Sequence, residues 1–128
     1  MRVLLDSMAA IMWWTEADRL GERARAVLEG DEGDVHLSAV SVWEVANKNR
    51  IGKLDMIVDF PGQFSALADD NSWRLLDLTP THAMRAGYLP GAHRDPFDRL
   101  LAGQALVEDM TVLTNDAEFA ALGCKVLW

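Results

Sequence analysis

The sequence predicts an α/β domain in which a central, mostly parallel sheet is covered by helices on both faces. Short apolar runs alternate with segments of helical periodicity along the whole chain, which is the pattern of βα units. The apolar runs are continuous, as expected for strands that are buried on both faces. A length of 128 residues suits one domain with its own core, and no linker or repeat divides it.

The first part of the chain predicts two strands and two helices. Residues 3–5 form an apolar run that is too short for an amphipathic helix, so we expect a strand there. Helices are expected over residues 8–14 and 17–29. The Gly- and Asp-rich stretch 30–34 favours a turn that leads into a second strand over residues 35–38.

The middle of the chain predicts two helices and a strand. The helix expected over residues 41–51 ends before Gly52, a residue type that favours helix C-termini. The next helix covers residues 60–70, with a proline near its start. The run 73–78 is the third strand candidate.

The last part contains the clearest helix, over residues 95–108, with Asp95 as N-cap and Pro96 in its first turn. A shorter helix is expected before it, because Pro90 and Gly91 interrupt the periodic pattern. The remaining elements are a helix over 81–88, a strand over 111–114, a helix over 116–122 and a strand over 125–127.

Four acidic residues stand near the carboxyl ends of the predicted strands. Asp6 directly follows the first strand, and Asp116 comes two residues after the fourth. Glu44 lies one turn into the helix after the second strand, and Asp98 lies in the first turn of the helix that begins at Asp95. The carboxyl ends of parallel strands meet at one edge of a sheet, so we expect these acids to converge. Carboxylates with few histidines favour Mg²⁺ or Mn²⁺ over Zn²⁺.

Each acid also has a purely structural explanation. Asp6 and Asp116 are good helix N-caps, and Asp98 favours a helix N-terminus through the macrodipole. Glu44 stands three residues after Ser41, which is the spacing of a capping box. A first-turn acid can serve both a cap and a metal ion, so the spacing leaves both roles open.

The formal net charge of −8 argues against unaided binding to nucleic acid, whose phosphates require Lys and Arg. Either bound metal ions reverse the local charge, or a basic partner protein completes the unit. The single cysteine excludes an intrachain disulfide. No apolar run approaches the roughly 20 residues of a membrane span, and Asp6 interrupts the first run too early for a signal peptide. We therefore expect a cytoplasmic protein without membrane contact.

Four segments of the chain resemble PIN domains, and they occur in the right order over essentially its whole length. The longest of them, residues 93–101, is similar to the subgroup of VapC-type toxins. The segments are Leu4-Leu5-Asp6-Ser7, Val42-Trp43-Glu44, His93-Arg94-Asp95-Pro96-Phe97-Asp98-Arg99-Leu100-Leu101 and Thr114-Asn115-Asp116.

The resemblance implies a three-layer α/β/α fold and a Mg²⁺- or Mn²⁺-dependent endoribonuclease, the toxin of a toxin–antitoxin pair. It implies hydrolysis of RNA by a metal-activated water, leaving a 5′-phosphate and a 3′-hydroxyl, with a cognate antitoxin and a second copy of the chain as partners. The matching metal-binding and catalytic acids are Asp6, Glu44, Asp98 and Asp116. Residues expected to support these ligands or to orient the substrate are Asp95, Ser7, Thr114 and Asn115.

Met8 departs from the family pattern, which commonly has a polar residue, often His or Asn, two positions after the first Asp. A thioether cannot hydrogen-bond metal ligands or a phosphate as an amide or imidazole does. The alternative is therefore a catalytically impaired PIN-fold protein that only binds a partner. A DNA nuclease of related fold also stays open. Receiver domains and Asp-x-Asp phosphatases fit poorly, because Asp6 lacks the acidic neighbour they need.

Several other side chains have two interpretations. Lys48, Arg50 and Lys53 are candidate RNA contacts next to Glu44, but they also fit a solvated helix face; the same two readings apply to Arg99. The tryptophans are expected mainly in the core. Since adjacent tryptophans on a helix cannot face one way, the helix with Ile11, Met12, Trp13 and Trp14 is a candidate surface for antitoxin or dimer contact. The three histidines are not spaced as a metal cluster.

Overall fold

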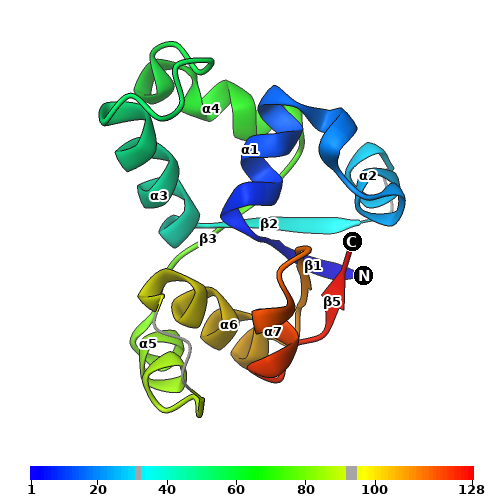
Figure 1. Cartoon of the computed structure of the whole chain (residues 1–128), viewed down its shortest axis with the longest axis vertical. Helices are drawn as coiled ribbons and strands as arrows, with labels where there is room; N and C mark the ends of the chain where they lie inside the picture. The colour runs from blue at the N-terminus through cyan, green and yellow to red at the C-terminus, as the bar shows by residue number, and fades with distance from the viewer. Residues whose placement is uncertain (31–32, 92–94) are drawn as a thin grey trace.

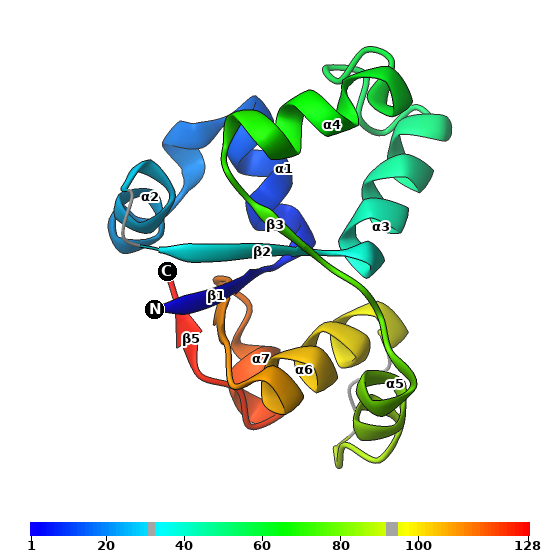
Figure 2. The same cartoon turned by 180° about the vertical axis from the view of Figure 1, so that it is seen from behind.

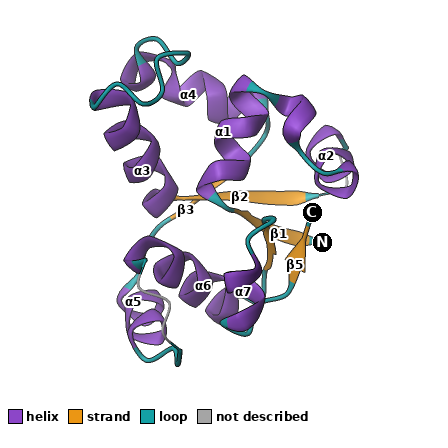
Figure 3. Cartoon of the chain, in the orientation of Figure 1, coloured by secondary structure: helices purple, strands orange, loops and turns teal. Residues whose placement is uncertain are grey.

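A five-stranded parallel sheet lies between two layers of helices, as Figures 1 and 3 show. The computed structural model describes residues 1–30, 33–91 and 95–128. The strand order is β3-β2-β1-β4-β5, and every neighbouring pair is parallel. The strands are β1 (Arg2–Leu5), β2 (Asp34–Ser38), β3 (Arg74–Leu76), β4 (Thr111–Leu113) and β5 (Val126–Leu127).

The helices divide between the two faces of the sheet. In Figures 1 and 2, α1 to α4 cover one face and α5 to α7 cover the other. This arrangement confirms the α/β/α fold that the sequence predicts. The helices are α1 (Ser7–Thr15), the short 3₁₀ helix η1 (Ala17–Arg19), α2 (Glu22–Glu29), α3 (Ala39–Arg50), α4 (Phe60–Asp70), α5 (Pro80–Gly87), α6 (Pro96–Glu108) and α7 (Ala117–Ala121).

Strand β1 is the centre of the sheet and joins both halves of the core. Val3 and Leu5 point into the cluster that contains Ala10 of α1, whereas Leu4 points into the cluster around Leu101 of α6. Val3, Leu4 and Leu5 are all fully buried. Full burial of one such side chain is worth about 1.5–3 kcal/mol. The continuous apolar run is therefore explained by burial of β1 on both faces.

The expected helix over residues 17–29 is broken into η1 and α2. Leu20 adopts an extended conformation between them and is buried in the core. A Cβ at Gly21 would stand 2.6 Å from the side chain of Trp128, so only glycine allows this close approach. Tertiary packing of Leu20 and Trp128 thus overrides the local helical periodicity.

The start of α3 also differs from the prediction. Ser38, and not Ser41, is the N-cap, because its hydroxyl accepts a hydrogen bond of 3.0 Å from the backbone N–H of Val40. The same hydroxyl donates to Oε1 of Gln104 on α6 at 2.5 Å, and both side chains are fully buried. Ser41 therefore lies inside the first turn of α3 and makes no capping box with Glu44.

The other bounds agree with the prediction to within a few residues. Strand β3 is shorter than expected, and Trp73 before it is buried. Helix α5 begins at Pro80, with Thr79 as its N-cap. Part of the turn predicted over residues 30–34 and part of the motif over 93–101 lie outside the described residues. Within the described ranges, no helix has the length and apolar character needed to cross a membrane.

Helices α5 and α6 approach closely at Gly103, which is buried. A Cβ at this position would stand 2.8 Å from the backbone nitrogen and from the Cβ of Ala86 on α5. Real Cβ atoms do not come so close, so a side chain here requires movement of the α5 backbone. This contact holds α5 against α6.

We predict that Gly103→Ala lowers the free energy of unfolding by about 1–3 kcal/mol, the usual cost of overpacking. Gly87→Ala is the matched control, because a Cβ at Gly87 meets nothing within 4 Å. In the control, the better helix propensity of alanine should change stability by less than about 1 kcal/mol, in the stabilising direction. Urea denaturation of both variants measures the difference, and equal stabilities would contradict the close-packing argument.

Candidate active site

The acids lie where the chain changes direction across the sheet. Strands β2 and β3 lie on one side of β1, and β4 and β5 lie on the other. The chain after β1 therefore turns one way, and the chain after β4 turns the other way. In open parallel sheets, ligands bind outside the carboxyl ends of the strands at such a point. Asp6 follows β1 and Asp116 follows β4, so both stand at this edge.

Asp6 is held by a short relay of hydrogen bonds. The hydroxyl of Thr114 donates to Oδ2 of Asp6 at 2.9 Å and accepts from the backbone N–H of Asp116 at 3.0 Å. Asp6 and Thr114 are both buried. Asp6 occupies the N-cap position of α1, and its carboxylate accepts from Thr114 at the strand edge.

Burial raises the pKa of Asp6 above its ordinary value. The hydrogen bond from Thr114 lowers that pKa, as do the nearby backbone N–H groups of Met8 and Ser7, whereas the negative charge of Asp116 raises it. Burial outweighs the hydrogen bonds because removing a carboxylate from water is costly. Asp6 is therefore a buried acid whose charge is incompletely compensated by its surroundings.

Ser7 connects α1 to α3 beside Asp6. Its hydroxyl lies 2.8 Å from the hydroxyl of Ser41 and 2.8 Å from Oε1 of Glu44. A hydroxyl has one proton and an ionised carboxylate can only accept, so Ser7 donates to Glu44 and accepts from Ser41. Figure 2 shows α1 and α3 leaving the carboxyl-end edge of the sheet next to one another. The hydrogen bond from Ser7 holds the Glu44 side chain against the start of α1.

Glu44 faces the acids of α6. Burial is the largest cause that raises its pKa; the hydrogen bond from Ser7 and the charge of Lys48 lower it, and the charges of Asp95 and Asp98 raise it again. Asp95 is the N-cap of α6 and accepts from the N–H groups of Phe97 and Asp98 at 2.9 and 3.4 Å. The capping role predicted for Asp95 is thus confirmed, and its charge still reaches Glu44.

The acids form two groups, Asp6 with Asp116 and Glu44 with Asp95 and Asp98, and Ser7 lies between them. Asp116 also caps α7 by accepting from the N–H of Glu118 at 3.0 Å. Among the residues that the structure describes, no three His, Cys, Asp or Glu side chains approach closely enough to hold a metal ion. The donor chemistry nevertheless suits a hard divalent cation, since every donor is a carboxylate and burial leaves the charges of Asp6 and Glu44 poorly compensated.

Of the three basic residues predicted beside Glu44, one lies at the site and two lie farther along the chain. Lys48 lies at the site: its ammonium contacts Sδ of Met8 at 3.7 Å and its charge acts on Glu44. Arg50 bonds Asn47 at the C-terminal end of α3, and exposed Lys53 follows that helix. Given a rise of 1.5 Å per residue, Arg50 lies about 9 Å beyond Glu44 along the helix axis.

Arg99 and Asn115 have different surroundings. The Arg99 guanidinium donates to the backbone carbonyl of Leu89. Asn115 is exposed between β4 and α7. Ser41, which the sequence suggested only as a cap, is an additional site residue; its position three residues before Glu44 places both on one helix face and was the available signal.

The apolar side chains of α1 are divided between the core and the surface. Ile11 and Met12 are buried, and Trp14 packs against Trp73 at a centroid distance of 5.4 Å, but Trp13 and Trp14 are only partly buried, so the contact with an antitoxin or a second copy stays a prediction. One expectation is wrong. Trp43, expected in the core, is 51% exposed. It precedes Glu44 on α3 and stacks on Phe97, the residue before Asp98.

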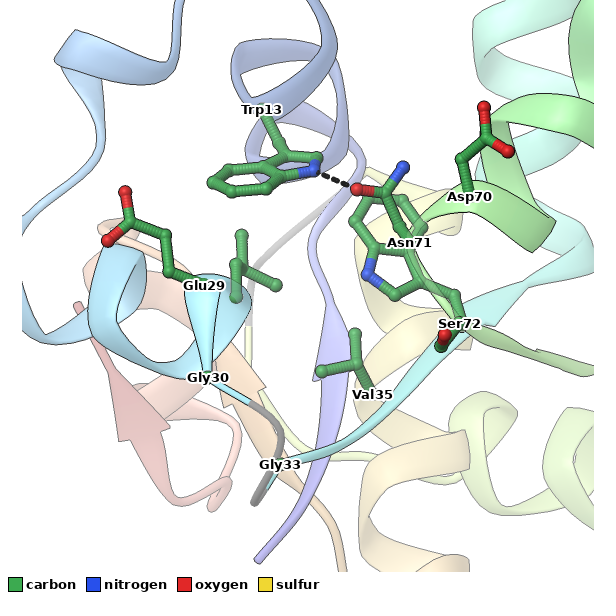
Figure 4. A pocket seen from close by; sticks show the side chains of 10 residues that line it. Trp13, Glu29, Gly30, Gly33, Val35, Asp70, Asn71 and Ser72 are labelled. Atoms are coloured by element: carbon green, nitrogen blue, oxygen red, sulfur yellow. Dashed lines mark hydrogen bonds between the residues drawn. The ribbon is translucent and has the colours of Figure 1, made fainter.

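A pocket of about 550 Å³ lies at the other end of the sheet, beside the start of β2 (Figure 4). Trp13 lines it and donates from Nε1 to Oδ1 of Asn71 at 2.6 Å. Glu29 and Asp70 are the acids among its lining residues. None of the acids at the carboxyl ends of the strands lines this pocket, so it is separate from the candidate site.

The raised pKa values of Asp6 and Glu44 predict a stability that falls as pH rises. The folded state binds these protons more tightly than the unfolded state, so the free energy of unfolding decreases between the ordinary carboxyl pKa of about 4 and the raised values. In EDTA, Asp6→Asn should therefore be more stable than the parent near pH 7, and the gain should vanish near about pH 3.

Urea denaturation across this pH range measures the effect. Asp18→Asn, at a fully exposed carboxylate, is the control and should follow the parent curve. A lower stability of Asp6→Asn at neutral pH would contradict the assignment of an uncompensated buried charge.

Comparison with known proteins agrees with the fold. Ribonuclease VapC22 from Mycobacterium tuberculosis is 29% identical over 115 residues, which cover 89% of this chain and 86% of that protein. The structure of VapBC2 from Rickettsia felis, bound to a DNA fragment from its promoter, aligns with a TM-score of 0.69 at 17% identity and covers 99% of this chain and 98% of that chain. FitAcB from Neisseria gonorrhoeae aligns with a TM-score of 0.60 at 21% identity, covering 98% and 96%.

The similarities to VapBC2 and FitAcB concern the fold alone. The PIN domain family itself matches residues 3–124, a span that includes all four acids of the candidate site. The chain therefore belongs to the PIN domain family, and within it is distantly similar to VapC-type toxins of toxin–antitoxin systems.

Proposed function

We propose that this protein is a Mg²⁺- or Mn²⁺-dependent endoribonuclease that acts as the toxin of a toxin–antitoxin pair. The observation that carries the proposal is the buried carboxylate of Asp6, which is hydrogen-bonded to Thr114 and repelled by Asp116. A side chain kept in this costly state suits a cation site better than a structural one. Membership of the PIN domain family and the similarity to a protein named ribonuclease support the same activity.

In this proposal Asp6, Glu44, Asp98 and Asp116 are the ligands for the divalent cation. When bound, the cation would lower the pKa of a coordinated water and offset the charge on the phosphate. Thr114 keeps the Asp6 carboxylate oriented, and Ser7 does the same for Glu44. Glu44 or Asp116 accepts the proton of the attacking water. Lys48, which contacts Met8 and whose charge acts on Glu44, is placed to contact a substrate phosphate.

The partners follow from charge and from the relatives. A net charge of −8 suits a basic inhibitor segment that covers the acids, and FitAcB and VapBC2 name two-component assemblies. We propose a cognate antitoxin as one partner and a second copy of the chain as another. Met84 and Tyr88 on and after α5 are 66% and 83% exposed and offer apolar surface for such contacts. We propose that the protein acts in the cytoplasm, where its RNA substrate is found.

The test is cleavage of a labelled RNA pool in Mg²⁺, Mn²⁺ or EDTA. We predict cleavage with either metal and none in EDTA, and Asp6→Asn should lose at least about a hundredfold of the rate, as when a group that stabilises transition-state charge is removed. Mg²⁺ should also raise the Tm of the parent by binding the folded state, and Asp6→Asn should lose this rise.

Asp18→Asn is again the control, because it removes a carboxylate that is fully exposed on η1. It should cleave at the parent rate. An Asp6→Asn protein that cuts RNA as fast as the parent would refute the assignment, and cleavage of DNA in place of RNA would redirect it to the related DNA nucleases.

The second candidate is a partner-binding protein without catalysis, and Met8 is the observation that favours it. Its sulfur is the acceptor that faces Lys48, and sulfur is a weak acceptor. We predict that Met8→Asn raises the cleavage rate severalfold, because an amide oxygen holds the Lys48 ammonium more firmly. Met8→Leu, which keeps the volume without an acceptor, is the control and should not exceed the parent rate. No cleavage by any of the three proteins, with no effect of Mg²⁺ on Tm, would favour the non-catalytic protein.

A further inference from the structure

An exposed aromatic pair lies between α3 and α6. The rings of Trp43 and Phe97 stack with a centroid distance of 4.8 Å and an interplanar angle of 22°. Phe97 also packs against the buried cluster around Leu101, whereas Trp43 is 51% exposed. One ring is therefore fixed by the core, and it holds the other in a defined orientation at the surface. An indole ring that is stacked on one face and open to solvent on the other is a rigid aromatic platform.

The platform stands directly beside the acids. Trp43 precedes Glu44 on α3, and Phe97 precedes Asp98 on α6. The two helices contact each other through the aromatic pair, and the charges of Glu44 and Asp98 act on one another across the same two helices. Neighbouring side chains of a helix point about 100° apart around its axis, but their Cα atoms are only about 3.8 Å apart. The aromatic pair and the acids are therefore close enough for one nucleotide to reach both.

A shallow pocket adjoins the rings and is apolar throughout. Its volume is about 250 Å³, and the residues that line it are Ala39, Val40, Trp43, Leu78, Phe97 and Leu100. None of them is charged. Pockets for drug-sized ligands measure roughly 300–1,000 Å³, so this one suits a single flat ring. An apolar wall beside an aromatic face recognises the face of a ring and not its hydrogen-bonding edge.

We infer that Trp43 and Phe97 form a stacking platform that receives one nucleobase of a single-stranded RNA whose phosphate lies at the Glu44–Asp98 pair. The inference rests on the proposed function for the presence of RNA. Because stacking is tolerant of sequence, the platform binds any of the four bases, and it lowers the KM without taking part in the chemical step.

The binding experiment uses fluorescence anisotropy of a labelled single-stranded RNA with the parent protein in Ca²⁺, which takes carboxylate oxygen ligands as Mg²⁺ does, and a gel checks that the RNA stays intact. Trp43→Ala should weaken binding by roughly tenfold, within the usual range for loss of one stacked base. Trp43→Phe should retain most of the affinity, because an aromatic face remains. Met56→Ala is the control, since Met56 is 61% exposed on the segment between α3 and α4, and it should leave affinity unchanged.

A set of RNAs with one abasic position each then locates the stacked base. In the protein that retains Trp43, one abasic position should weaken binding by about the same factor as Trp43→Ala does. In the Trp43→Ala protein, the same abasic position should have no further effect. Exchanging the base at that position should change affinity little. In the parent background, Trp43→Ala should raise the KM for cleavage and leave kcat near the parent value.

Equal RNA affinity with and without Trp43, no detectable RNA binding by the parent protein in Ca²⁺, or equal affinity for every abasic RNA overturns the platform; Trp43 then serves a contact with a protein partner. The proposed function fails separately. If the parent does not cleave RNA but the abasic effect depends on Trp43, the platform stands and the nuclease assignment falls. If the parent cleaves RNA and no abasic position changes the affinity, the nuclease assignment stands and the platform falls.

Discussion

The hydroxyl of Ser7 is the contact on which the candidate site depends. It accepts from Ser41 and donates to Glu44, and so it joins the first turn of α1 to the first half of α3. Among the described residues, Ser7 is the hydrogen-bond donor to the half-buried Glu44 carboxylate, so its loss would leave that carboxylate with less compensation for burial. Ser7 itself is almost completely buried. This link positions Glu44, and the hydrogen bond from Thr114 positions Asp6.

The site is built at a cost to the fold. Burial raises the pKa of both Asp6 and Glu44, and neighbouring acids raise it further, so at neutral pH their charged forms destabilise the folded protein. The apolar core on both faces of β1 offsets this cost. The same poorly compensated charges are what would give a divalent cation its affinity. The same carboxylates therefore lower the stability of the cation-free protein and would strengthen the binding of a divalent cation.

The elements that the sequence predicted well are those decided locally. Strand β1 follows from a continuous apolar run, and Asp95 and Asp116 follow from the preference for acids at helix starts. The features that could not be predicted depend on contacts between distant segments. Ser38 caps α3 because Gln104, far along the chain, orients its hydroxyl, and a sequence with two serines near a helix start does not say which one caps.

The exposure of Trp43 likewise depends on the packing of α3 against α6, which neither helix encodes alone. The positions of the acids were predictable because a parallel sheet brings the ends of its strands to one edge. Their exact grouping into two sets was not, because it depends on side-chain directions across three helices.

The hydrogen bond between Thr114 and Asp6 joins residues that are 108 positions apart. A ribosome adds about 5–20 residues per second, so on the order of 5–20 s pass between synthesis of the two residues. During that interval β1 has no β4 beside it, and Asp6 and Asp116 cannot meet. A nascent chain therefore carries the first carboxylate without the second, and the cell that makes this protein is not exposed to the assembled acidic cluster until β4 has left the ribosome and docked. This delay gives a partner protein time to be present before the cluster exists.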